Sequence, residues 1–258
     1  MQVNGLSSVS DITVGILAFN TPETLVRNTI NSVQTTAPEA TIILASNNPN
    51  PDVQVLYQHM AESLKVKFLG NLANQGFGAG HNKILEAVQT KYYICCNPDV
   101  IVLPECIQNL IKTADAITDL GLIAPKVLNP DKSIQKLARR HLTILNWIIR
   151  QLGRFFKFST FETRFDYDKP QTLEFVSGCF FMTRTETILG HAGFDERFFM
   201  YCEDADLSRR ISRTLKNYYA PEATIIHEWN KGWSKSTSSF VTHIKSLAQY
   251  FLKHGVFD

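Results

Sequence analysis

The sequence has no excess of charge of either sign, because 26 Lys and Arg residues stand against 24 Asp and Glu residues in a chain of 258. Net charge therefore gives no indication of a nucleic-acid partner, and none is expected. Charged residues make up only 19% of the chain and hydrophobic residues 44%, which excludes a disordered tail protein and a collagenous one. A chain of this length fits one large domain or two small ones and can bury a substantial core.

Cysteine is scarce, and its five positions form no Cys-x-x-Cys pair. An odd number without that spacing predicts neither a disulfide framework nor a zinc site. The stretch from Met1 to Asp11 lacks a basic start followed by an apolar run, and no run of about 18 apolar residues occurs anywhere. We therefore expect no signal peptide, no membrane-spanning helix and a cytoplasmic location. The cysteines are Cys95, Cys96, Cys106, Cys179 and Cys202.

The first half of the chain alternates short apolar runs with segments of helical spacing. Strands are expected at 12–19, 41–45, 66–69 and 92–96, and helices at 22–33, 53–64 and 81–88. This alternation predicts an α/β fold with a mostly parallel central sheet and helices on both faces. Ligands of such sheets bind at the carboxyl ends of the strands. The polar residues expected at that end are Asn20, Asn47, Asn48, Asn97 and Asp99.

The second half predicts strands at 173–182 and 224–227 and helices at 203–215 and 240–254. No repeat or low-complexity linker interrupts the chain, so one continuous domain is expected. The segment from Lys132 to Phe161 has seven Lys and Arg residues, no acidic residue and many large apolar ones. That mixture suits an anionic membrane surface. It is equally typical of a core helix with a solvated basic face, or of a contact in a homodimer.

Two acidic segments are candidates for chemistry. Asn97-Pro98-Asp99 follows a predicted strand, where a carboxylate suits Mg²⁺ or Mn²⁺ bound to a substrate diphosphate; the same residues are also common in turns. Glu203-Asp204-Ala205-Asp206 follows a strongly aromatic stretch. Such a cluster could hold a base that removes a proton from a sugar hydroxyl, or could simply complement the dipole of a helix N-terminus.

Two further features are less specific. The run from Gly76 to Gly80 matches neither the Rossmann nor the P-loop pattern. We interpret it as a loop of close backbone approach that lines a nucleotide site without binding phosphate directly. His227 ends a short predicted strand. A lone histidine is more often structural, but His227 could complete a metal site with Asp99.

Five ordered stretches, covering residues 12 to about 250, resemble the family 2 inverting glycosyltransferases of the GT-A fold. The nearest likeness is to the rhamnosyltransferase-like branch that builds bacterial surface polysaccharides. The resemblance implies a Rossmann-like nucleotide-sugar-binding half at about 12–130 and an acceptor-binding half with a C-terminal helix at about 131–258. The stretches are 14–20, 74–82, 97–99, 177–181 and 193–207.

The resemblance also implies roles for individual residues. Asp204 is expected to be the general base, with Glu203 as the second candidate. Asp99 is expected to bind a divalent metal, Mg²⁺ or Mn²⁺, together with the donor diphosphate. His227 stays the candidate second ligand that its position at a strand end suggests. Acceptor contacts are expected at Gly178, Cys179 and Tyr201. The residues expected to bind the nucleotide-sugar are Phe19, Asn20, Ser46, Asn47, Gly76, Phe77, Gly78, His81, Asn82, Asn97 and Asp99.

Two positions depart from the family pattern. Ser46 stands where an Asp usually precedes Asn47, so contacts to the nucleobase or ribose are expected to differ. Asn97 stands where many members have Asp, so one carboxylate of the metal motif is absent; one carboxylate with diphosphate and water can still hold Mg²⁺.

The resemblance implies transfer of L-rhamnose from dTDP-rhamnose, with inversion, onto a glycan or a polyprenyl-diphosphate-linked acceptor. Such an acceptor would bring the enzyme to the inner face of the cytoplasmic membrane as a peripheral protein. A transferase that uses a UDP-hexose is one alternative, and a non-catalytic module that binds sugar nucleotides or glycans is another. A pyrophosphorylase would need a basic glycine loop near the N-terminus and a nicotinamide dehydrogenase its own glycine pattern, and both are missing.

Overall fold

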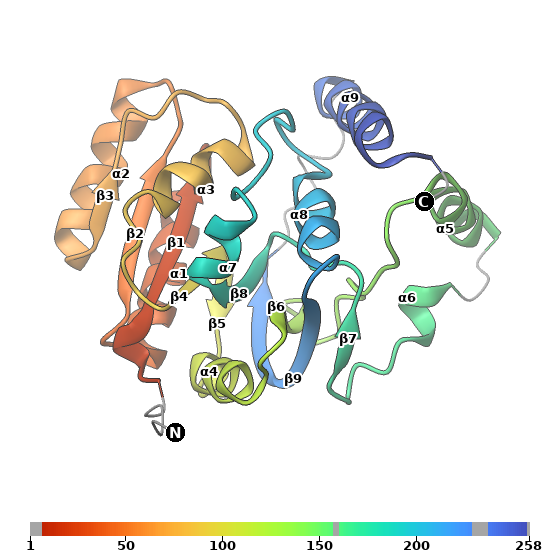
Figure 1. Ribbon diagram of the computed structural model, residues 1–258. Helices are drawn as coiled ribbons and strands as arrows, with labels where there is room; N and C mark the ends of the chain where they lie inside the picture. The colour runs from red at the N-terminus through yellow and green to blue at the C-terminus, as the bar shows by residue number, and fades with distance from the viewer. Residues whose placement is uncertain (1–6, 157–159, 229–236, 257–258) are drawn as a thin grey trace.

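The computed structural model describes residues 7–156, 160–228 and 237–256 (Figure 1). The strands in these ranges are β1 (Ile12–Ala18), β2 (Thr41–Ser46), β3 (Lys67–Leu69), β4 (Tyr92–Cys96), β5 (Val100–Val102), β6 (Leu120–Leu128), β7 (Gln171–Leu173), β8 (Phe180–Arg184) and β9 (Lys216–His227). The helices are the short 3-10 helix η1 (Val9–Asp11) and α1 (Glu23–Thr36), α2 (Pro51–Leu64), α3 (Phe77–Leu85), α4 (Cys106–Ala116), α5 (Ile144–Phe156), α6 (Phe161–Arg164), α7 (Thr185–Gly190), α8 (Glu203–Ile211) and α9 (Thr237–His254).

The strands form one sheet in the order β3-β2-β1-β4-β8-β6-β9-β5, with β7 paired to β9. The four strands of the first half, β3, β2, β1 and β4, are parallel, as their alternation with helices predicts. In the second half, β8 is antiparallel to both β4 and β6, whereas β9 is parallel to β6 and antiparallel to β5 and β7. The predicted α/β fold with helices on both faces is confirmed.

Each face of the sheet has its own apolar core, because side chains of a strand alternate between faces. Along β4, Tyr92, Ile94 and Cys96 join α1, α2 and α4 in one core, and Tyr93 and Cys95 join α3, α7 and α8 in the other. All five β4 residues are fully buried. This accounts for the continuous apolar run in the sequence, since a strand covered on both sides needs no polar face.

The structure differs from the sequence prediction at four elements, three of them in the second half. The single strand expected at 173–182 is two strands, β7 and β8, separated by a loop at residues 174–179. The strand expected at 224–227 begins at Lys216, because a shift in the β6–β9 register near Pro125 allows the longer strand to pass Pro221. The helices expected at 203–215 and 81–88 instead span Glu203–Ile211 and Phe77–Leu85.

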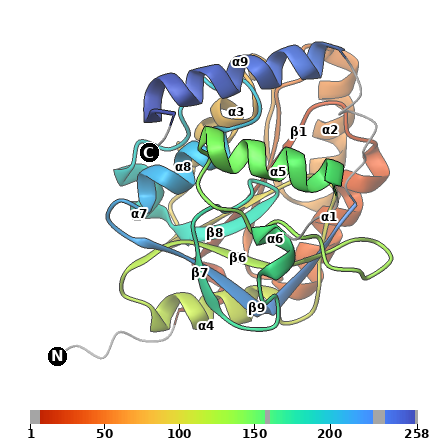
Figure 2. The same ribbon diagram turned by 90° about the vertical axis from the view of Figure 1, so that its right-hand side faces the viewer.

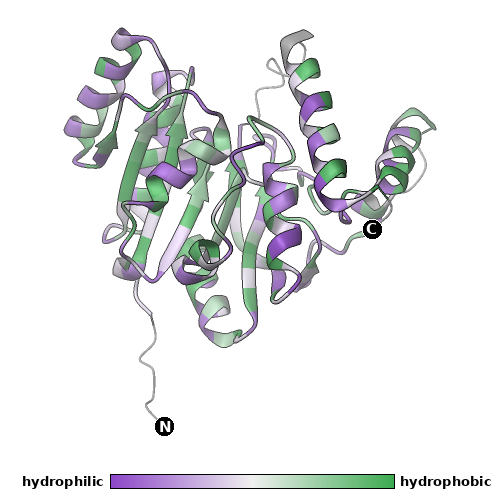
Figure 3. Cartoon of the chain, turned by 45° about the horizontal axis from the view of Figure 1, so that its top comes forward, coloured by the Kyte–Doolittle hydropathy of each residue, from purple (hydrophilic) through white to green (hydrophobic). Residues whose placement is uncertain are grey.

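Helices α5 and α9 lie side by side at the edge of the second half (Figures 2 and 3). A third apolar cluster joins them, in which Trp147 of α5 meets Leu247 and Tyr250 of α9 and Phe175 of the 174–179 loop. Among the described helices, none combines the length and hydropathy needed to cross a bilayer.

Candidate functional site

The carboxyl ends of β1 and β2 bring the predicted nucleotide residues to one edge of the sheet. Ala18 pairs with Ser46 in the parallel register, so the turns that follow the two strands are neighbours. The amide of Asn48 ties these turns together by donating to the backbone oxygen of Phe19 at 2.6 Å and to the side-chain oxygen of Asn20. The sequence analysis placed Asn48 at this edge but gave it no role, and the structure shows it as the cross-link of the two turns.

Asn47 is the residue at this edge with unused hydrogen-bonding capacity. Its Nδ2 donates to the backbone oxygen of Gly76 at 3.3 Å, whereas its buried Oδ1 has no hydrogen-bond partner. Buried polar atoms are nearly always paired in folded proteins, so an unpaired one indicates a ligand position. Ser46, by contrast, is fully buried, and its Oγ accepts from the backbone N–H of Asn48 at 3.4 Å.

The second corner of the site joins the ends of β4 and β9. His227 is the last residue of β9 and is 7% exposed, and its Nε2 lies 3.3 Å from Oδ1 of Asp99 and 3.5 Å from Nδ2 of Asn97. That same Asp99 oxygen is buried and has no hydrogen-bond partner. Asp99 and His227, which are more than a hundred residues apart in the sequence, therefore lie next to each other as predicted.

Gln135, which the sequence analysis did not single out, sets the tautomer of His227. Its Nε2 donates to the backbone oxygen of His227 at 2.8 Å, which fixes the amide so that its Oε1 faces Nδ1 of the ring at 3.2 Å. The imidazole proton then lies on Nδ1, and Nε2 presents a lone pair toward Asp99. A carboxylate oxygen and an imidazole lone pair that face each other without a proton between them fit a divalent cation.

The protein alone supplies few ligands at this corner. Among the described residues, no group of three or more His, Cys, Asp and Glu side chains lies close enough to hold a metal ion. A metal at Asp99 and His227 would therefore need oxygen ligands from a substrate diphosphate and from water, as Mg²⁺ commonly takes.

The acidic pair lies at the start of α8. The carboxylate of Asp204 accepts from the backbone N–H of Gly178 at 3.1 Å and from that of Ala205 at 2.8 Å. Burial raises the pKa of Asp204, while the Gly178 hydrogen bond and the charge of Arg139 oppose that rise. Burial raises the pKa of Glu203 well above its usual range, the negative charge of Asp204 raises it further, and its buried Oε2 has no hydrogen-bond partner.

These surroundings give the two carboxyl groups different protonation. A proton on the pair resides on Glu203, which is more buried and less well hydrogen-bonded, and Asp204 is the carboxylate available as a base. The chain reaches this position through Tyr201 and Cys202, which have φ values of 70° and 65°. Left-handed conformations are strained for such residues and concentrate at functional sites.

The loop between β7 and β8 connects the two corners. The backbone oxygen of Cys179 accepts from the N–H of Asn97 at 2.8 Å, and one residue earlier Gly178 donates to Asp204. A Cβ atom on Gly178 would lie 3.5 Å from Cβ of Asp204 and 3.3 Å from the ring of Phe77. Gly178 and Cys179, both predicted to contact the acceptor, thus lie between the metal corner and the candidate base.

The glycine run has a packing role at its first residues. Gly76 begins α3 with a φ of 101°, and a Cβ atom there would lie 1.8 Å from the backbone oxygen of Phe199. Gly78 likewise approaches the side chain of Phe194, which a Cβ atom would meet at 2.8 Å. The close backbone approach expected of this loop is thus directed at the 194–199 segment, which leads to the acidic pair.

The two polar residues after the glycine run are also engaged within the protein. His81 is fully buried, with Nδ1 2.6 Å from the hydroxyl of Tyr93, and burial lowers its pKa to about 3. Asn82 exchanges two hydrogen bonds of 2.9 Å with the backbone of Phe194. Both side chains hold α3 to the core and to the 194–199 segment, so we leave them out of the proposed ligand set.

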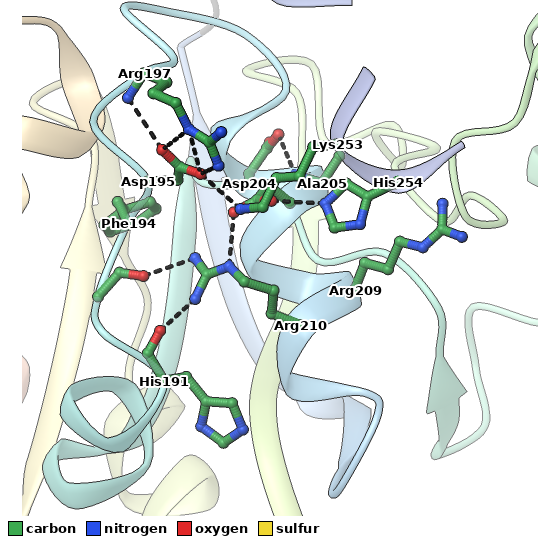
Figure 4. Close-up of polar contacts among 12 residues, drawn as sticks. His191, Phe194, Asp195, Arg197, Asp204, Ala205, Arg209, Arg210, Lys253 and His254 are labelled. Carbon is green, nitrogen blue, oxygen red and sulfur yellow. Dashed lines mark hydrogen bonds and ion pairs between the residues drawn. The ribbon is translucent and has the colours of Figure 1, made fainter. Parts of the chain in front are cut away.

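A buried ionic network holds α8 against α9 (Figure 4). Asp206 is fully buried, and its carboxylate contacts Arg210 at 2.7 Å, Lys253 at 2.5 Å and His254 at 2.7 Å. Lys253 also reaches Asp195 at 2.6 Å. The C-terminal helix is therefore tied by charge to the helix that carries the candidate base.

Comparison with known proteins identifies the family of this chain. The sequence profile of glycosyl transferase family 2 matches residues 13–188, which is most of the chain. The chain belongs to glycosyl transferase family 2. The matched range contains the β1, β2 and β4 ends and the 174–179 loop, and it confirms the resemblance inferred from the five ordered stretches.

Two curated proteins are similar to the chain in sequence. The chain is 27% identical, over 63% of its length, to the N-acetylglucosaminyl-diphospho-decaprenol L-rhamnosyltransferase of Mycobacterium tuberculosis, and the match spans only 58% of that protein. It is 24% identical to the rhamnosyltransferase WbbL of Escherichia coli K12, over 83% of each chain.

Two solved structures share the GT-A fold. They are GalNAc-T7 with UDP, GalNAc and Mn²⁺, and the mannosyltransferase PcManGT of Pyrobaculum calidifontis with GDP-Man and Mn²⁺. GalNAc-T7 has a TM-score of 0.69 at 16% identity, and the match covers 95% of this chain and 48% of that one. PcManGT has a TM-score of 0.65 at 11% identity, and the match covers 96% of this chain and 66% of that one.

Proposed function

We propose that this family 2 protein is an inverting glycosyltransferase that moves L-rhamnose from dTDP-rhamnose onto a glycan or a polyprenyl-diphosphate-linked acceptor. The observation that carries the proposal is the backbone connection between Asp99 and Asp204 through Asn97, Cys179 and Gly178. It holds a corner suited to a metal and a diphosphate beside a carboxylate suited to a base. The rhamnosyltransferase relatives support the choice of sugar.

On the donor side, the turns after β1 and β2 would hold the nucleoside, with the unpaired Oδ1 of Asn47 as an acceptor for an N–H or hydroxyl group. Asp99 and His227 would hold a divalent metal, Mg²⁺ or Mn²⁺, which would supply charge stabilisation for the departing nucleoside diphosphate. Gln135 keeps the Nε2 lone pair of His227 directed at Asp99. Asn97 lies beside both, within 3.5 Å of His227.

On the acceptor side, Asp204 would take the proton from the attacking hydroxyl. Its two backbone hydrogen bonds fix the carboxylate, and its raised pKa makes it a stronger base than an exposed aspartate. One displacement with one base inverts the anomeric carbon, so a β-linked donor sugar gives an α-linked product. Gly178, Cys179 and Tyr201 would surround the acceptor sugar.

A lipid-linked acceptor would bring the protein to a membrane surface. The apolar side chains of α5 at helical spacing face solvent, with exposed fractions from 40% to 80%, in a segment whose charges are all basic. An exposed apolar stripe with basic residues suits the anionic interface of a bilayer. Lys157 and Phe158, which the sequence analysis counted in this segment, lie outside the described residues. The exposed side chains are Leu145, Ile148, Ile149, Leu152, Phe155 and Phe156.

Vesicle flotation tests the membrane contact. We expect wild type to bind vesicles that contain phosphatidylglycerol and the Phe155→Ser/Phe156→Ser variant to lose most of that binding. The matched control is Val55→Ser/Leu56→Ser, which removes two exposed apolar side chains from α2 on the opposite half. Equal flotation of all three proteins, or concentration-dependent dimers of wild type that the Phe155/Phe156 variant lacks, would contradict the membrane contact.

Donor binding tests the transferase itself. We would measure thermal shifts with dTDP-rhamnose, UDP-glucose, UDP-galactose, UDP-N-acetylglucosamine and GDP-mannose, each with Mn²⁺, with Mg²⁺ and with EDTA. A ligand that binds the native state raises the melting midpoint by an amount that grows with the logarithm of its concentration over Kd. Metal-dependent stabilisation by dTDP-rhamnose alone is the expected result. Stabilisation by a UDP-hexose would replace the proposed donor, and no response to any donor would favour a non-catalytic module.

A further inference from the structure

Two arginine side chains and a histidine from separate segments gather on the acceptor side of the site. Burial, with the charges of Arg150 and Arg139 adding to it, lowers the pKa of His243, so the histidine takes part as a neutral imidazole. Arg139 precedes α5, Arg150 lies on α5, and His243 lies on α9. Glu162 of α6 holds both guanidinium groups, with its Oε1 2.6 Å from Nε of Arg150 and 3.7 Å from Nε of Arg139. Arg139, Arg150 and Glu162 together carry one positive charge, because two guanidinium groups share one carboxylate.

The cluster lies beside the candidate base. The guanidinium of Arg139 stacks over the ring of Phe175 at 5.0 Å, and Phe175 packs against Cys202 and Ala205, which flank Glu203 and Asp204. His243 stacks on Tyr201 with ring centroids 5.0 Å apart and an interplanar angle of 28°. The positive charge of Arg139 also opposes the burial that raises the pKa of Asp204. An anion held by these cations would therefore be close to the proton-transfer position.

The helices that carry Arg150 and His243 also carry exposed apolar side chains. On α5 these form the stripe described above, and on α9 the exposed fractions range from 46% to 87%. Figure 3 shows the two helices next to each other at one side of the molecule. A positive cluster bordered on one side by a base and on the other by apolar surface matches a ligand with a hydroxyl, an anionic centre and a hydrocarbon chain. The exposed residues of α9 are Phe240, Val241, Ile244 and Leu252.

We infer that Arg139, Arg150 and His243 bind the diphosphate of a lipid-linked acceptor, and that the apolar faces of α5 and α9 contact its hydrocarbon chain. This inference rests on the proposed function, which it extends by naming the acceptor subsite. A guanidinium offers five N–H donors in a planar fork that matches phosphate oxygens, and both guanidinium groups form ion pairs with Glu162. An acceptor sugar whose attacking hydroxyl contacts Asp204 would carry its anomeric diphosphate on the other side of the sugar ring, toward Arg139.

Calorimetry with farnesyl diphosphate tests the subsite directly. The titration is made in EDTA, because the donor corner needs a divalent metal to hold a diphosphate whereas guanidinium groups do not. We expect binding that farnesol and inorganic diphosphate do not match, since each lacks one half of the ligand. Replacing Arg139 or Arg150 removes charge-assisted hydrogen bonds, so Arg139→Ala and Arg150→Gln should each weaken binding about tenfold to hundredfold.

Arg140→Ala is the matched control. Arg140 is adjacent in sequence and equally charged, but its side chain is 56% exposed and pairs with Glu174. It should leave the Kd for farnesyl diphosphate unchanged. Arg139→Lys, which keeps the charge and the stem, should recover part of the affinity and guards against a folding defect in the alanine variant.

Four outcomes would overturn the inference. The first three are no binding of farnesyl diphosphate to wild type, equal losses of affinity in Arg139→Ala and Arg140→Ala, and no preference of wild type for farnesyl diphosphate over farnesol. The fourth is a loss of binding to phosphatidylglycerol vesicles in Arg139→Ala as large as its loss of binding to farnesyl diphosphate, which would assign the cluster to membrane headgroups. The proposed function is judged separately. Donor binding without farnesyl diphosphate binding would leave a transferase with another acceptor, and the reverse would leave the subsite without the transferase.

Discussion

Asp206→Asn is expected to be strongly destabilising, because it removes one charge from a buried network while keeping the side chain's shape. In the native protein the carboxylate contacts Arg210 on its own helix and Lys253 and His254 on α9, all within 2.7 Å. Asp206 is fully buried, and His254 is 5% exposed. In the variant, Arg210 and Lys253 stay in a low-dielectric environment without the negative charge of Asp206.

The magnitude follows from this burial. Removing one partner of a buried ion pair typically costs about 3–5 kcal/mol. Lys253 keeps its 2.6 Å contact with Asp195, so we expect the lower end, about 3 kcal/mol. A chain of this size changes its melting temperature by about 2–4 °C per kcal/mol, which predicts a fall of about 6–12 °C.

Thermal unfolding, with urea unfolding as a second probe, measures this loss. The matched control is Asp119→Asn, because Asp119 also lies 2.7 Å from a lysine, Lys216, but that pair is on the surface. Exposed ion pairs contribute little, so the control should melt close to wild type. If the two variants lost the same stability, or if Asp206→Asn melted with wild type, the argument that this network holds α9 to α8 would be refuted.

The remaining predictions concern the glycine turn, acid stability and the metal corner. Gly76→Ala should lose at least about 2 kcal/mol of unfolding free energy, because its Cβ atom would collide with Phe199. The control is Gly190→Ala, whose Cβ atom would have no atom within 4 Å, and it should change the unfolding free energy by less than about 0.5 kcal/mol. Equal urea midpoints of the two variants would contradict this. Hydrogen bonds from Arg197, with Lys253 adding to them, hold the pKa of Asp195 below its usual range. At low pH the unfolded state therefore binds more protons than the folded state, so the unfolding free energy falls as the pH drops below about 4. Urea titrations of Asp195→Asn at several pH values should show a smaller fall. A pH profile equal to that of wild type would contradict this role of Asp195. Asp99→Asn should abolish the metal-dependent part of the donor's thermal shift, and a shift that still responds to EDTA would exclude Asp99 as the metal ligand.

The site residues that follow the ends of strands were predictable from the sequence. An apolar run followed by Asn or Asp marks the carboxyl end of a buried strand, and this is why Asn20, Asn47 and Asp99 were found at the correct edge. The pairing of Asp99 with His227 was also predicted, as one of two interpretations of a histidine that ends a strand. No sequence signal marked Gln135, because a lone glutamine in a coil segment acquires its role only when the β6 and β9 ends meet.

The predictions failed where tertiary contacts override local pattern. The loop at 174–179 has the composition of a strand, but it turns aside to donate the N–H of Gly178 to Asp204. The composition of residues 132–161 left a core helix with a basic face as one alternative, and the structure instead shows the apolar side chains of α5 exposed to solvent. Residues between 100 and 131 were left unassigned, although they form β5, α4 and β6.

The central claim is that Asp204 is the base of a glycosyl transfer, and turnover by Asp204→Asn compared with its donor affinity tests this most directly. Calorimetry with dTDP-rhamnose and Mn²⁺ gives the affinity, and release of dTDP with a GlcNAc-diphosphate-farnesyl acceptor gives the turnover. Loss of a general base lowers turnover by about 10²–10⁴-fold, so we predict a loss of that size with a donor Kd within about twofold of wild type. Turnover equal to that of wild type would contradict the assignment of the base and the mechanism built on it.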